Sequence, residues 1–200
     1  MTGAHIVEKM PPAEESDGRR RRSQDSRTRI IYAMLDLVGE GDPAPGAERV
    51  AERAQVGLRT VFRHFKDMDS LYREMSDHIA DELRSLLDQP FQAASWRDRV
   101  LELVGRRGAV YEKIAPFKRA SDIFRNRSRF LESDHVMLTT AAREILLREI
   151  PVEAELEPVI VEALDLLLSY EAWSRLRREQ GLSSAQAVGA LQAAVERMLA

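Results

Sequence analysis

Residues 47–65, with the sequence AERVAERAQVGLRTVFRHF, decide the fold. From Ala47 to Ala54 small apolar residues recur at steps of three and four, which predicts a short helix with a narrow apolar face. After a break at 55–57, the same spacing from Leu58 to Phe65 predicts a second helix. Small side chains on the first helix let the second cross it closely, and two short helices crossed in this way form a helix-turn-helix.

The second predicted helix turns a polar and aromatic face outward, and this face suits DNA. An α-helix fits the major groove, and side chains near its N-terminal end reach the base edges. Arg59 has the fork geometry for guanine, Thr60 can contact a base edge or a phosphate, and Phe62 can touch a thymine methyl group. The predicted DNA-binding residues of this stretch are Gly57, Leu58, Arg59, Thr60, Phe62, Arg63, His64 and Lys66. The alternative is a solvated surface helix in an all-helical protein.

This stretch resembles the DNA-binding domain of the TetR family of transcriptional regulators, which are one-component helix-turn-helix repressors. The resemblance covers about residues 27–75 and rests on Val56, Thr60, Val61, Phe62, His64 and Phe65, followed by Leu71 and Tyr72. A weaker similarity to the family's ending lies in residues 173–182. The resemblance implies a homodimeric repressor that binds a palindromic operator on double-stranded DNA. It also implies release by a small-molecule effector, of unidentified structure, that binds the variable C-terminal domain.

Three positions depart from the family's pattern. Gln55 stands where the family usually has glycine, so we expect a left-handed backbone there to be strained. Gly57 replaces the serine or threonine that opens the second helix, and it provides a weaker N-cap without a hydroxyl for a phosphate. Met68 replaces a lysine that anchors the next helix, although Asp67 can still cap that helix. These departures bear on the phosphate contacts more than on the fold.

The composition predicts an all-α, cytoplasmic protein. β-branched residues never cluster with period two, and leucine, alanine, arginine and glutamate dominate the 200 residues. The chain has no cysteine, which excludes disulfides and thiolate metal sites and is compatible with a reducing compartment. No run approaches the roughly 18 apolar residues of a membrane helix, and the first residues lack the apolar core of a signal peptide. We therefore expect no membrane segment and no cofactor.

An enzyme on a helical scaffold is the alternative from another functional class. Four histidines, no cysteine and no strand-turn-helix nucleophile motif argue against it. Glu74, His78 and Glu82 share one helix face and could hold a divalent metal, but such a row more often forms ion pairs on a helix surface. A further alternative is a regulator that has lost operator reading and acts through protein–protein contacts.

The charge is unevenly distributed along the chain. The net charge is −3, but residues 18–66 contain 11 basic and 6 acidic side chains, which leaves this part at +5 and the remainder at −8. Local potential governs steering toward phosphate, so a negative total does not exclude DNA binding. The pattern divides the chain into a basic arm at 1–22, a helix-turn-helix domain at 23–70, and a larger helical effector-binding and dimerisation domain at 71–200.

The N-terminal arm is expected to be disordered, because its first part is polar and contains Pro11 and Pro12. Within the arm, Arg20, Arg21 and Arg22 would follow the minor groove or the phosphates, and the alternative is a solvated tail. Ser23 or Ser26 would cap the first helix. Arg27, in the first turn of that helix, could reach the DNA backbone.

The C-terminal part predicts a dimer interface. Residues 153–179 predict the longest helix of the chain, with an apolar stripe too wide for a single neighbour. A last helix over about 184–199 carries small apolar residues and is capped by Ser183 or Ser184. Two such helices suit a symmetric four-helix contact between two chains, so a homodimer is expected through these two segments. The alternative is a thicker core within one chain.

Several aromatic and polar residues of the C-terminal domain are candidates for an effector pocket. Helical bundles hold ligands between their helices. The candidates are Trp96, Tyr111, Phe117, Phe124, His135, Tyr170 and Trp173. For each of them ordinary core packing is the alternative, and no spacing among them identifies a ligand.

Overall fold

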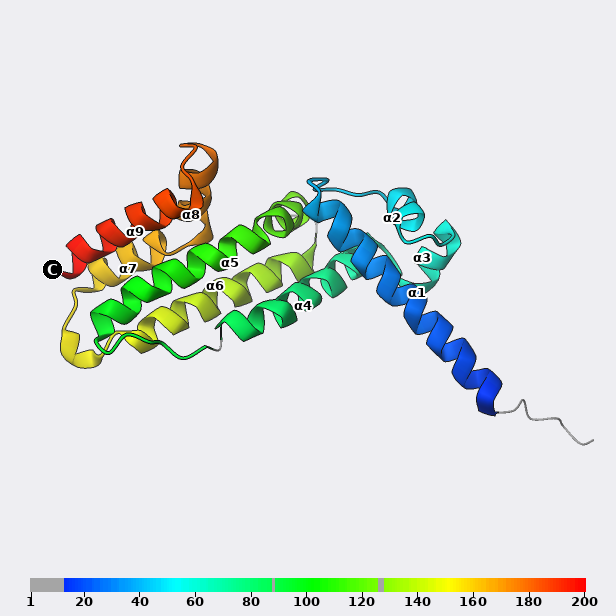
Figure 1. Ribbon diagram of the computed structural model, residues 1–200, viewed down its shortest axis with the longest axis horizontal. Coiled ribbons are helices and arrows are strands. Elements are labelled where there is room, and N and C mark those ends of the chain that lie inside the picture. Colours follow the sequence, from blue (N-terminus) through cyan, green and yellow to red (C-terminus); the bar gives the residue numbers. More distant parts are fainter. Residues whose placement is uncertain (1–12, 88, 126–127) are drawn as a thin grey trace, which may run out of the picture.

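The computed structural model describes residues 13–87, 89–125 and 128–200, and in these ranges the protein is all-α, as predicted (Figure 1). The α-helices are α1 Ala13–Gly39, α2 Ala47–Arg53, α3 Leu58–His64, α4 Met68–Leu87, α5 Trp96–Arg125, α6 Arg129–Glu149, α7 Pro158–Leu167, α8 Tyr170–Arg178 and α9 Ser184–Leu199, and a 3-10 turn, η1, spans Val152–Ala154. None of the helices in these ranges is both long enough and apolar enough to cross a membrane.

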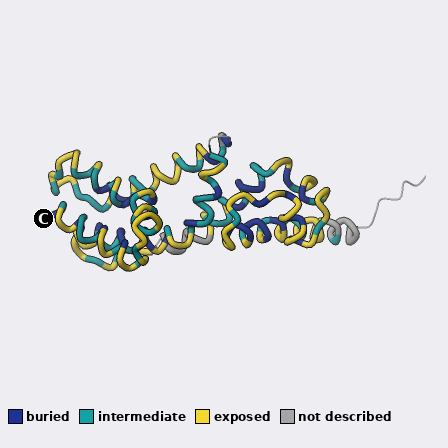
Figure 2. The backbone as a smooth tube through the Cα atoms, turned by 90° about the horizontal axis from the view of Figure 1, so that it is seen from above, coloured by how far each residue is buried: buried dark blue, intermediate teal, exposed yellow. Residues whose placement is uncertain are grey.

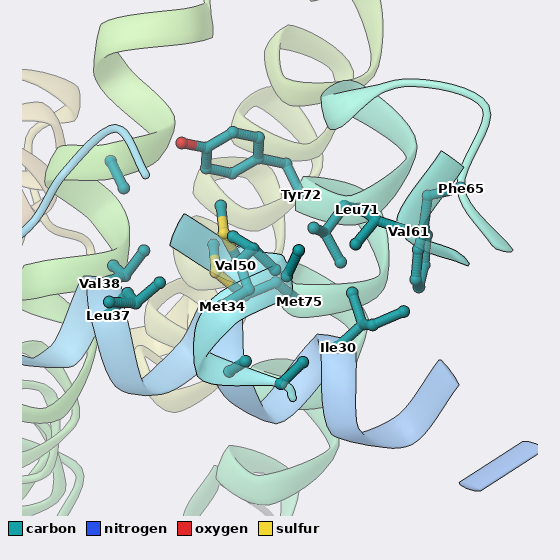
Figure 3. Close-up of a cluster of buried hydrophobic side chains, with 14 of the residues drawn as sticks. Ile30, Met34, Leu37, Val38, Val50, Val61, Phe65, Leu71, Tyr72 and Met75 are labelled. Carbon is teal, nitrogen blue, oxygen red and sulfur yellow. The ribbon is translucent and has the colours of Figure 1, made fainter. Parts of the chain in front are cut away.

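The first hydrophobic core joins α1, α2, α3 and α4, and Figure 3 shows its side chains pointing toward one another. Ile30 and Met34 of α1 and Leu71 and Met75 of α4 have no exposed surface, and Val61 of α3 is 1% exposed. Burial of such a side chain contributes about 1.5–3 kcal/mol relative to exposure. One side of α3 therefore packs in the core, and the opposite side faces solvent.

The second core joins α5, α6, α7, α8 and α9. Val100, Leu164 and Val195 have no exposed surface and lie at its centre. Helix α5 reaches both cores, because Val100 belongs to the second and Ala120 to the first. Figure 2 shows buried segments in both halves of an elongated molecule. The chain is thus organised as a small domain that contains α2 and α3 and a larger bundle, and α5 and α6 link them because each contributes to both cores.

Helix α5 continues through Pro116, although a proline inside a helix usually kinks or ends it. A proline removes one helical hydrogen bond and crowds the preceding turn. Here Ala115 is buried in the second core and Ala120 in the first, so tertiary packing holds the helix on both sides of the proline.

Residues 13–22 belong to α1, so the prediction of a disordered arm over 1–22 is wrong for them, and residues 1–12 lie outside the described ranges. Alanine, glutamate and arginine dominate residues 13–22 and all have high helix propensity. The expected caps at Ser23 and Ser26 are also wrong, because both residues lie inside α1. The Ser26 hydroxyl donates to the carbonyl oxygen of Arg22 at 2.9 Å.

The single helix predicted over 153–179 is also wrong, and the longest helix that the structure describes is α5, with 30 residues. Pro158 occupies the first turn of α7, where a missing N–H costs nothing. Ser169 interrupts the helix, because its hydroxyl accepts a hydrogen bond from the N–H of Ala172 at 3.2 Å and caps α8. Figure 1 shows α8 turned away from the direction of α7. The wide apolar stripe is therefore two stripes on two helices.

The last helix starts as predicted. The Ser183 hydroxyl accepts from the N–H of Gln186, and the Gln186 side chain accepts from the N–H of Ser183 at 2.9 Å. This reciprocal pair is a capping box. It fixes the start of α9, whose buried side packs on α5 through residues such as Ala187 and Leu191.

Candidate nucleic-acid interface

The turn between α2 and α3 is closed by backbone hydrogen bonds. The N–H of Gln55 donates to the carbonyl of Glu52, and the N–H of Val56 donates to that of Ala51, each at 3.0 Å. Gln55 has a φ of 53°, and this combination is a Schellman C-cap. Gln55 thus adopts the left-handed backbone for which the family's glycine is better suited. Glycine is the usual residue at this position because it has no Cβ to clash.

We expect Gln55→Gly to raise the free energy of unfolding by about 0.5–1 kcal/mol. Relief of a left-handed backbone gains about 1–2 kcal/mol, and the extra chain entropy of glycine offsets about 0.5–1 kcal/mol of that gain. Urea unfolding at equilibrium measures the difference. Gln55→Ala is the matched control, because it keeps the Cβ and should bring no gain. A glycine variant no more stable than the original chain contradicts strain at this turn.

Gly57 forms the N-cap of α3 in an extended conformation, with φ −71° and ψ 148°, and no side chain caps the helix. Any residue adopts this conformation, and a Cβ at Gly57 would meet no atom within 4 Å. A serine would therefore fit, and the weak cap follows from the residue type alone. The next cap is intact, because the Asp67 carboxylate accepts from the N–H of Ser70 at 2.8 Å.

Helix α3 buries Val61 and presents its opposite side to solvent. Leu58 and Phe62, one turn apart, are 37% and 49% exposed. Such exposure of large apolar side chains on a short helix is typical of a surface that meets a partner. The exposed predicted residues are Gly57, Leu58, Arg59, Phe62, Arg63 and Lys66, and the half-buried ones are Thr60 and His64. The predicted DNA-binding face of α3 is therefore open to solvent, as expected.

The basic residues of this face are not neutralised by acidic side chains. Three acidic residues of this part of the chain pair with other arginines, as Arg53–Glu40, Arg49–Asp42 and Arg27–Glu74. In the part of the chain that the structure describes, Arg59, Arg63 and Lys66 make no ion pair. Unpaired cations on one side of a helix concentrate positive potential there, which attracts phosphate.

His64 differs from these cations, because it is uncharged at neutral pH. Burial lowers its pKa, and the nearby charges of Arg63 and Arg27 lower it further. Its Nε2 is buried and has no hydrogen-bond partner among the described residues. A neutral imidazole can still donate a hydrogen bond to a phosphate, but it adds no positive charge to the face.

We expect the original chain to lose stability relative to His64→Gln as the pH falls from about 8 to about 5.5. The folded-state pKa of His64 lies below 6.5, so the unfolded chain binds more protons in this range and acidification favours unfolding. The glutamine variant lacks this contribution, and the other histidines contribute equally to both proteins. Urea unfolding of both proteins across this range measures the difference, and parallel stability curves would contradict it.

Arg27 is half-buried, and its guanidinium is engaged by other side chains of the protein. Its guanidinium donates to the Glu74 carboxylate at 2.7 Å and lies 4.9 Å from the centre of the Phe65 ring. This geometry does not support the predicted DNA contact. Arg27 instead links α1 to α4 and to Phe65, which follows α3, so it helps to position α3.

Arg20, Arg21 and Arg22 are exposed on the first turns of α1, which extend beyond the other helices in Figure 1. The Arg22 side chain donates back to the carbonyl of Gly18 at 3.1 Å. Consecutive residues of a helix point about 100° apart. These three arginines therefore fan around the helix axis, and they cannot all enter one groove as a flexible arm could.

The predicted effector residues lie in several parts of the structure, and the effector pocket stays a prediction. Tyr111, Tyr170 and Trp173 pack on one another in the second core, with ring centres 5.6–5.9 Å apart, and Trp96 packs against the same core. Aromatic packing of this kind fills space rather than leaving it open.

The remaining candidates lie in other places. Phe117 and Phe124 pack against the first core, where the Phe124 ring lies 5.0 Å from that of Tyr72. His135 faces Lys118, with its Nδ1 2.9 Å from the lysine Nζ. A cavity of about 530 Å³ between α1, α4 and α5 is lined in part by Phe117, and one of about 270 Å³ between α5 and α8 is lined in part by Trp173.

Arg107 is a buried residue that the sequence did not indicate. It is 7% exposed, donates to the carbonyl of Leu168 at 3.0 Å and also donates to that of Ala142. The Tyr111 hydroxyl donates to the same Leu168 carbonyl at 2.7 Å. Burial lowers the pKa of the Arg107 guanidinium, which remains charged at neutral pH. The side chain thus joins α5 to α6 and to the end of α7.

The metal alternative finds no support in the described residues, which contain no cluster of metal-binding side chains. Glu74 pairs with Arg27, and the His78 ring packs edge-on against Tyr32 at 5.0 Å. The side chain of Glu82 lies outside the described part of the chain.

Comparison with known proteins identifies the fold. No protein-family model and no curated protein matches the chain. Among solved structures, one described as a TetR-family transcriptional regulator from Rhodococcus sp. aligns with a TM-score of 0.65 and 19% identity over 88% of this chain and 99% of that one. A second TetR-family protein, from Mesorhizobium loti, aligns with a TM-score of 0.57 and 17% identity over 89% and 96%.

A Clostridium perfringens protein described as a fatty acid metabolism regulator aligns with a TM-score of 0.59 and 11% identity, over 84% of this chain and 96% of that one. These alignments cover nearly all of each solved chain, so the likeness includes the small domain and the bundle together. The chain has the fold of the TetR-family transcriptional regulators.

Proposed function

We propose that this protein is a sequence-specific DNA-binding transcriptional regulator whose α3 enters the major groove. The observation that carries the proposal is the exposed face of α3, where Arg59, Arg63 and Lys66 are unpaired beside Phe62. Arg59 lies at the N-terminal end of the helix, where side chains reach base edges. Arg63 and Lys66 bind phosphates and fix the position of the helix.

Further contacts surround this centre. Leu58 and Phe62 pack against the sugar-phosphate wall or a thymine methyl group, and Thr60 and His64 donate hydrogen bonds at the edge of the face. The backbone N–H groups that follow Gly57 lie at the start of a helix, where phosphates are favoured. Arg20, Arg21 and Arg22 add phosphate contacts from α1, which makes affinity more dependent on salt.

The proposed active form is a homodimer, because one reading helix contacts too little DNA for good specificity. Apolar side chains that remain exposed support an interface that includes α7. Val159 and Leu166, two turns apart on this helix, are 63% and 67% exposed. The exposed positions of α8 carry charged residues such as Glu171 and Arg175. We therefore assign the interface to α7 and α9, within the two segments that the sequence indicated.

We expect Leu166→Glu to weaken dimerisation at least about tenfold, because the interface would bury an unpaired carboxylate. Analytical ultracentrifugation over a range of protein concentrations measures the dissociation constant. Ile123→Glu is the matched control, since Ile123 is 52% exposed on α5, outside the proposed interface. Equal dissociation constants for Leu166→Glu and the original chain would exclude α7 from the interface.

In the proposed mechanism the dimer represses transcription by occupying a palindromic operator, and a small-molecule effector releases it. A ligand can do this only if it binds the DNA-free arrangement of the reading helices more tightly than the DNA-bound one. The fold of TetR-family regulators supports this mechanism, and no enzymatic step belongs to it.

Selection of the purified protein on randomised duplex DNA tests the proposed function. We expect enrichment of a palindromic sequence, because a symmetric dimer places two copies of α3 on two half-sites. Circular dichroism and ultracentrifugation on the same sample establish that the protein is helical and dimeric. Absence of enrichment from such a sample would favour a regulator that acts through protein contacts and would contradict operator reading.

A further inference from the structure

A cavity of about 530 Å³ lies where α1, α4 and α5 meet, and we call it the junction cavity. Its volume is within the range of about 300–1,000 Å³ that small-molecule sites occupy. Tyr32 and Leu35 of α1, Ile79 of α4, and Ile114 and Phe117 of α5 line it. Helix α1 belongs to the first core, while α5 reaches both cores. A molecule in this cavity would therefore contact both parts of the protein.

Side chains of the protein fill the part of the bundle around Tyr111 and Arg107, and the cavity between α5 and α8 has only about half the volume of the junction cavity. Tyr111, Tyr170 and Trp173 pack together, and Arg107 occupies the space between α5 and the carbonyls of α6 and the end of α7. A ligand there would have to displace buried aromatic rings and a hydrogen-bonded cation. The junction cavity requires no such displacement.

The charges around the junction cavity favour a cation on the α1 side. Asp36 and Glu40, one helical turn apart, both line the cavity. Glu40 accepts two hydrogen bonds from Arg53, at 2.6 and 2.7 Å, so its charge is already compensated. The Asp36 carboxylate lies 4.0 Å from the same guanidinium and accepts no hydrogen bond from it. Asp36 therefore has the capacity to bind a second cation.

Aromatic rings add to this preference. Tyr32 and Phe117 line the same cavity, and the faces of such rings attract cations. Lys113 also lines it, from α5, and makes no ion pair or hydrogen bond with a described residue. Its charge repels a cation from the α5 side and so directs the cation toward α1.

We propose that the junction cavity binds an aromatic organic cation, whose ring lies against Ile79 and Ile114 and whose ammonium group lies against Asp36. Binding itself does not depend on the proposed function. Its regulatory consequence does, because the cation would favour the arrangement of α1, α4 and α5 that forms this cavity. If the cavity is smaller in the DNA-bound arrangement, the cation binds that arrangement more weakly, and its binding therefore disfavours the DNA-bound state.

Isothermal titration calorimetry of the full chain with three naphthalene probes tests the chemistry. The probes are naphthylmethylammonium, naphthylacetate and naphthylmethanol, which share a ring system and differ in charge. We expect the ammonium probe to bind most tightly. Asp36→Asn should weaken its binding at least about tenfold, since a charge-assisted hydrogen bond is lost. Asp25→Asn, which removes an exposed carboxylate from α1 outside the cavity, should leave binding unchanged.

Gly39→Leu tests the location. Gly39 lines the cavity, and a Cβ built there meets no atom within 4 Å, so a leucine side chain enters open space without displacing another residue. This variant should lose probe binding and keep its thermal unfolding temperature, and Gly39→Ala should retain most of the binding. Unchanged binding by a folded Gly39→Leu would overturn the location. Tighter binding of naphthylacetate that requires Lys113, or no binding of any probe, would overturn the cationic ligand.

These titrations contain no DNA, so their outcome is separate from that of the operator selection. If an operator is selected, naphthylmethylammonium should weaken its binding by the original chain and not by Gly39→Leu. Equal weakening of both proteins would overturn regulation through this cavity. Probe binding without any selected operator would support the cavity and contradict the proposed function.

Discussion

Arg59→Ala should weaken operator binding by about 1–3 kcal/mol and should relax the preference for one base pair in each half-site. Arg59 is exposed at the N-terminal end of α3 and makes no ion pair with a described residue, so its guanidinium is free to take both acceptors of a guanine. Loss of this bidentate contact removes the energy that distinguishes guanine from the other bases. Fluorescence anisotropy against the selected operator and its single-base variants measures both effects.

Arg63→Ala is the matched control for this prediction. Arg63 is one turn further along the same exposed face, and the proposed docking places it against phosphate rather than base edges. Its loss should weaken binding to every operator variant by a similar factor and leave the base preferences unchanged. If Arg59→Ala also weakens all sequences uniformly, Arg59 contacts phosphate and another residue reads the base.

Leu71→Ala should lower the free energy of unfolding by about 2–5 kcal/mol. Leu71 has no exposed surface and packs in the core that holds α3 against α1 and α4 (Figure 3). The variant loses the transfer energy of the missing carbon atoms and leaves a cavity that the surrounding helices cannot fill. Equilibrium urea unfolding, followed by circular dichroism, measures the change.

Leu147→Ala is the control, because Leu147 is 42% exposed on α6. This substitution should lower the free energy of unfolding by less than about 0.5 kcal/mol. The Leu71 variant should also bind operator more weakly at temperatures where the small domain begins to unfold. A cost below about 1 kcal/mol for Leu71→Ala would contradict the tight packing of this core.

The helix-turn-helix could be predicted from the sequence because its signals are local. The three- and four-residue spacing between Ala47 and Phe65 gave the two short helices, and the exposed face followed from the period of the second. The turn lies at residues 55–57, where the sequence placed the break between the two helices. Each of these inferences uses residues less than one helix length apart, where periodicity and capping decide the conformation.

Two errors arose where local signals conflicted. Between residues 153 and 179 the apolar spacing continues through Ser169, although this serine caps a new helix. The apolar stripe was too wide for a helix with a single neighbour, and this width indicated two helices rather than one. At 13–22 the polar composition suggested disorder, although alanine, glutamate and arginine are strong helix formers. Composition alone did not decide between a solvated coil and a solvated helix.

The interior of the bundle could not be predicted, because cavities depend on contacts between distant residues. Tyr111 and Trp173 were candidates for a pocket, but they are separated by about half of the bundle sequence and meet in its core. The sequence around Arg107 does not distinguish it from the exposed arginines, because its partner, the carbonyl of Leu168, is distant in the sequence. The junction cavity likewise requires three helices whose crossing the sequence does not specify.

Reading of a DNA sequence by α3 is tested most directly by the specificity ratio of the purified protein. This ratio is the dissociation constant for a scrambled duplex divided by that for the operator. The dissociation constants for the selected operator and for a scrambled duplex of equal length and composition are measured at several salt concentrations. We expect the operator to bind at least about 10³-fold more tightly, with both affinities falling steeply as salt increases. Equal affinity for the two duplexes at every salt concentration would contradict sequence reading by α3.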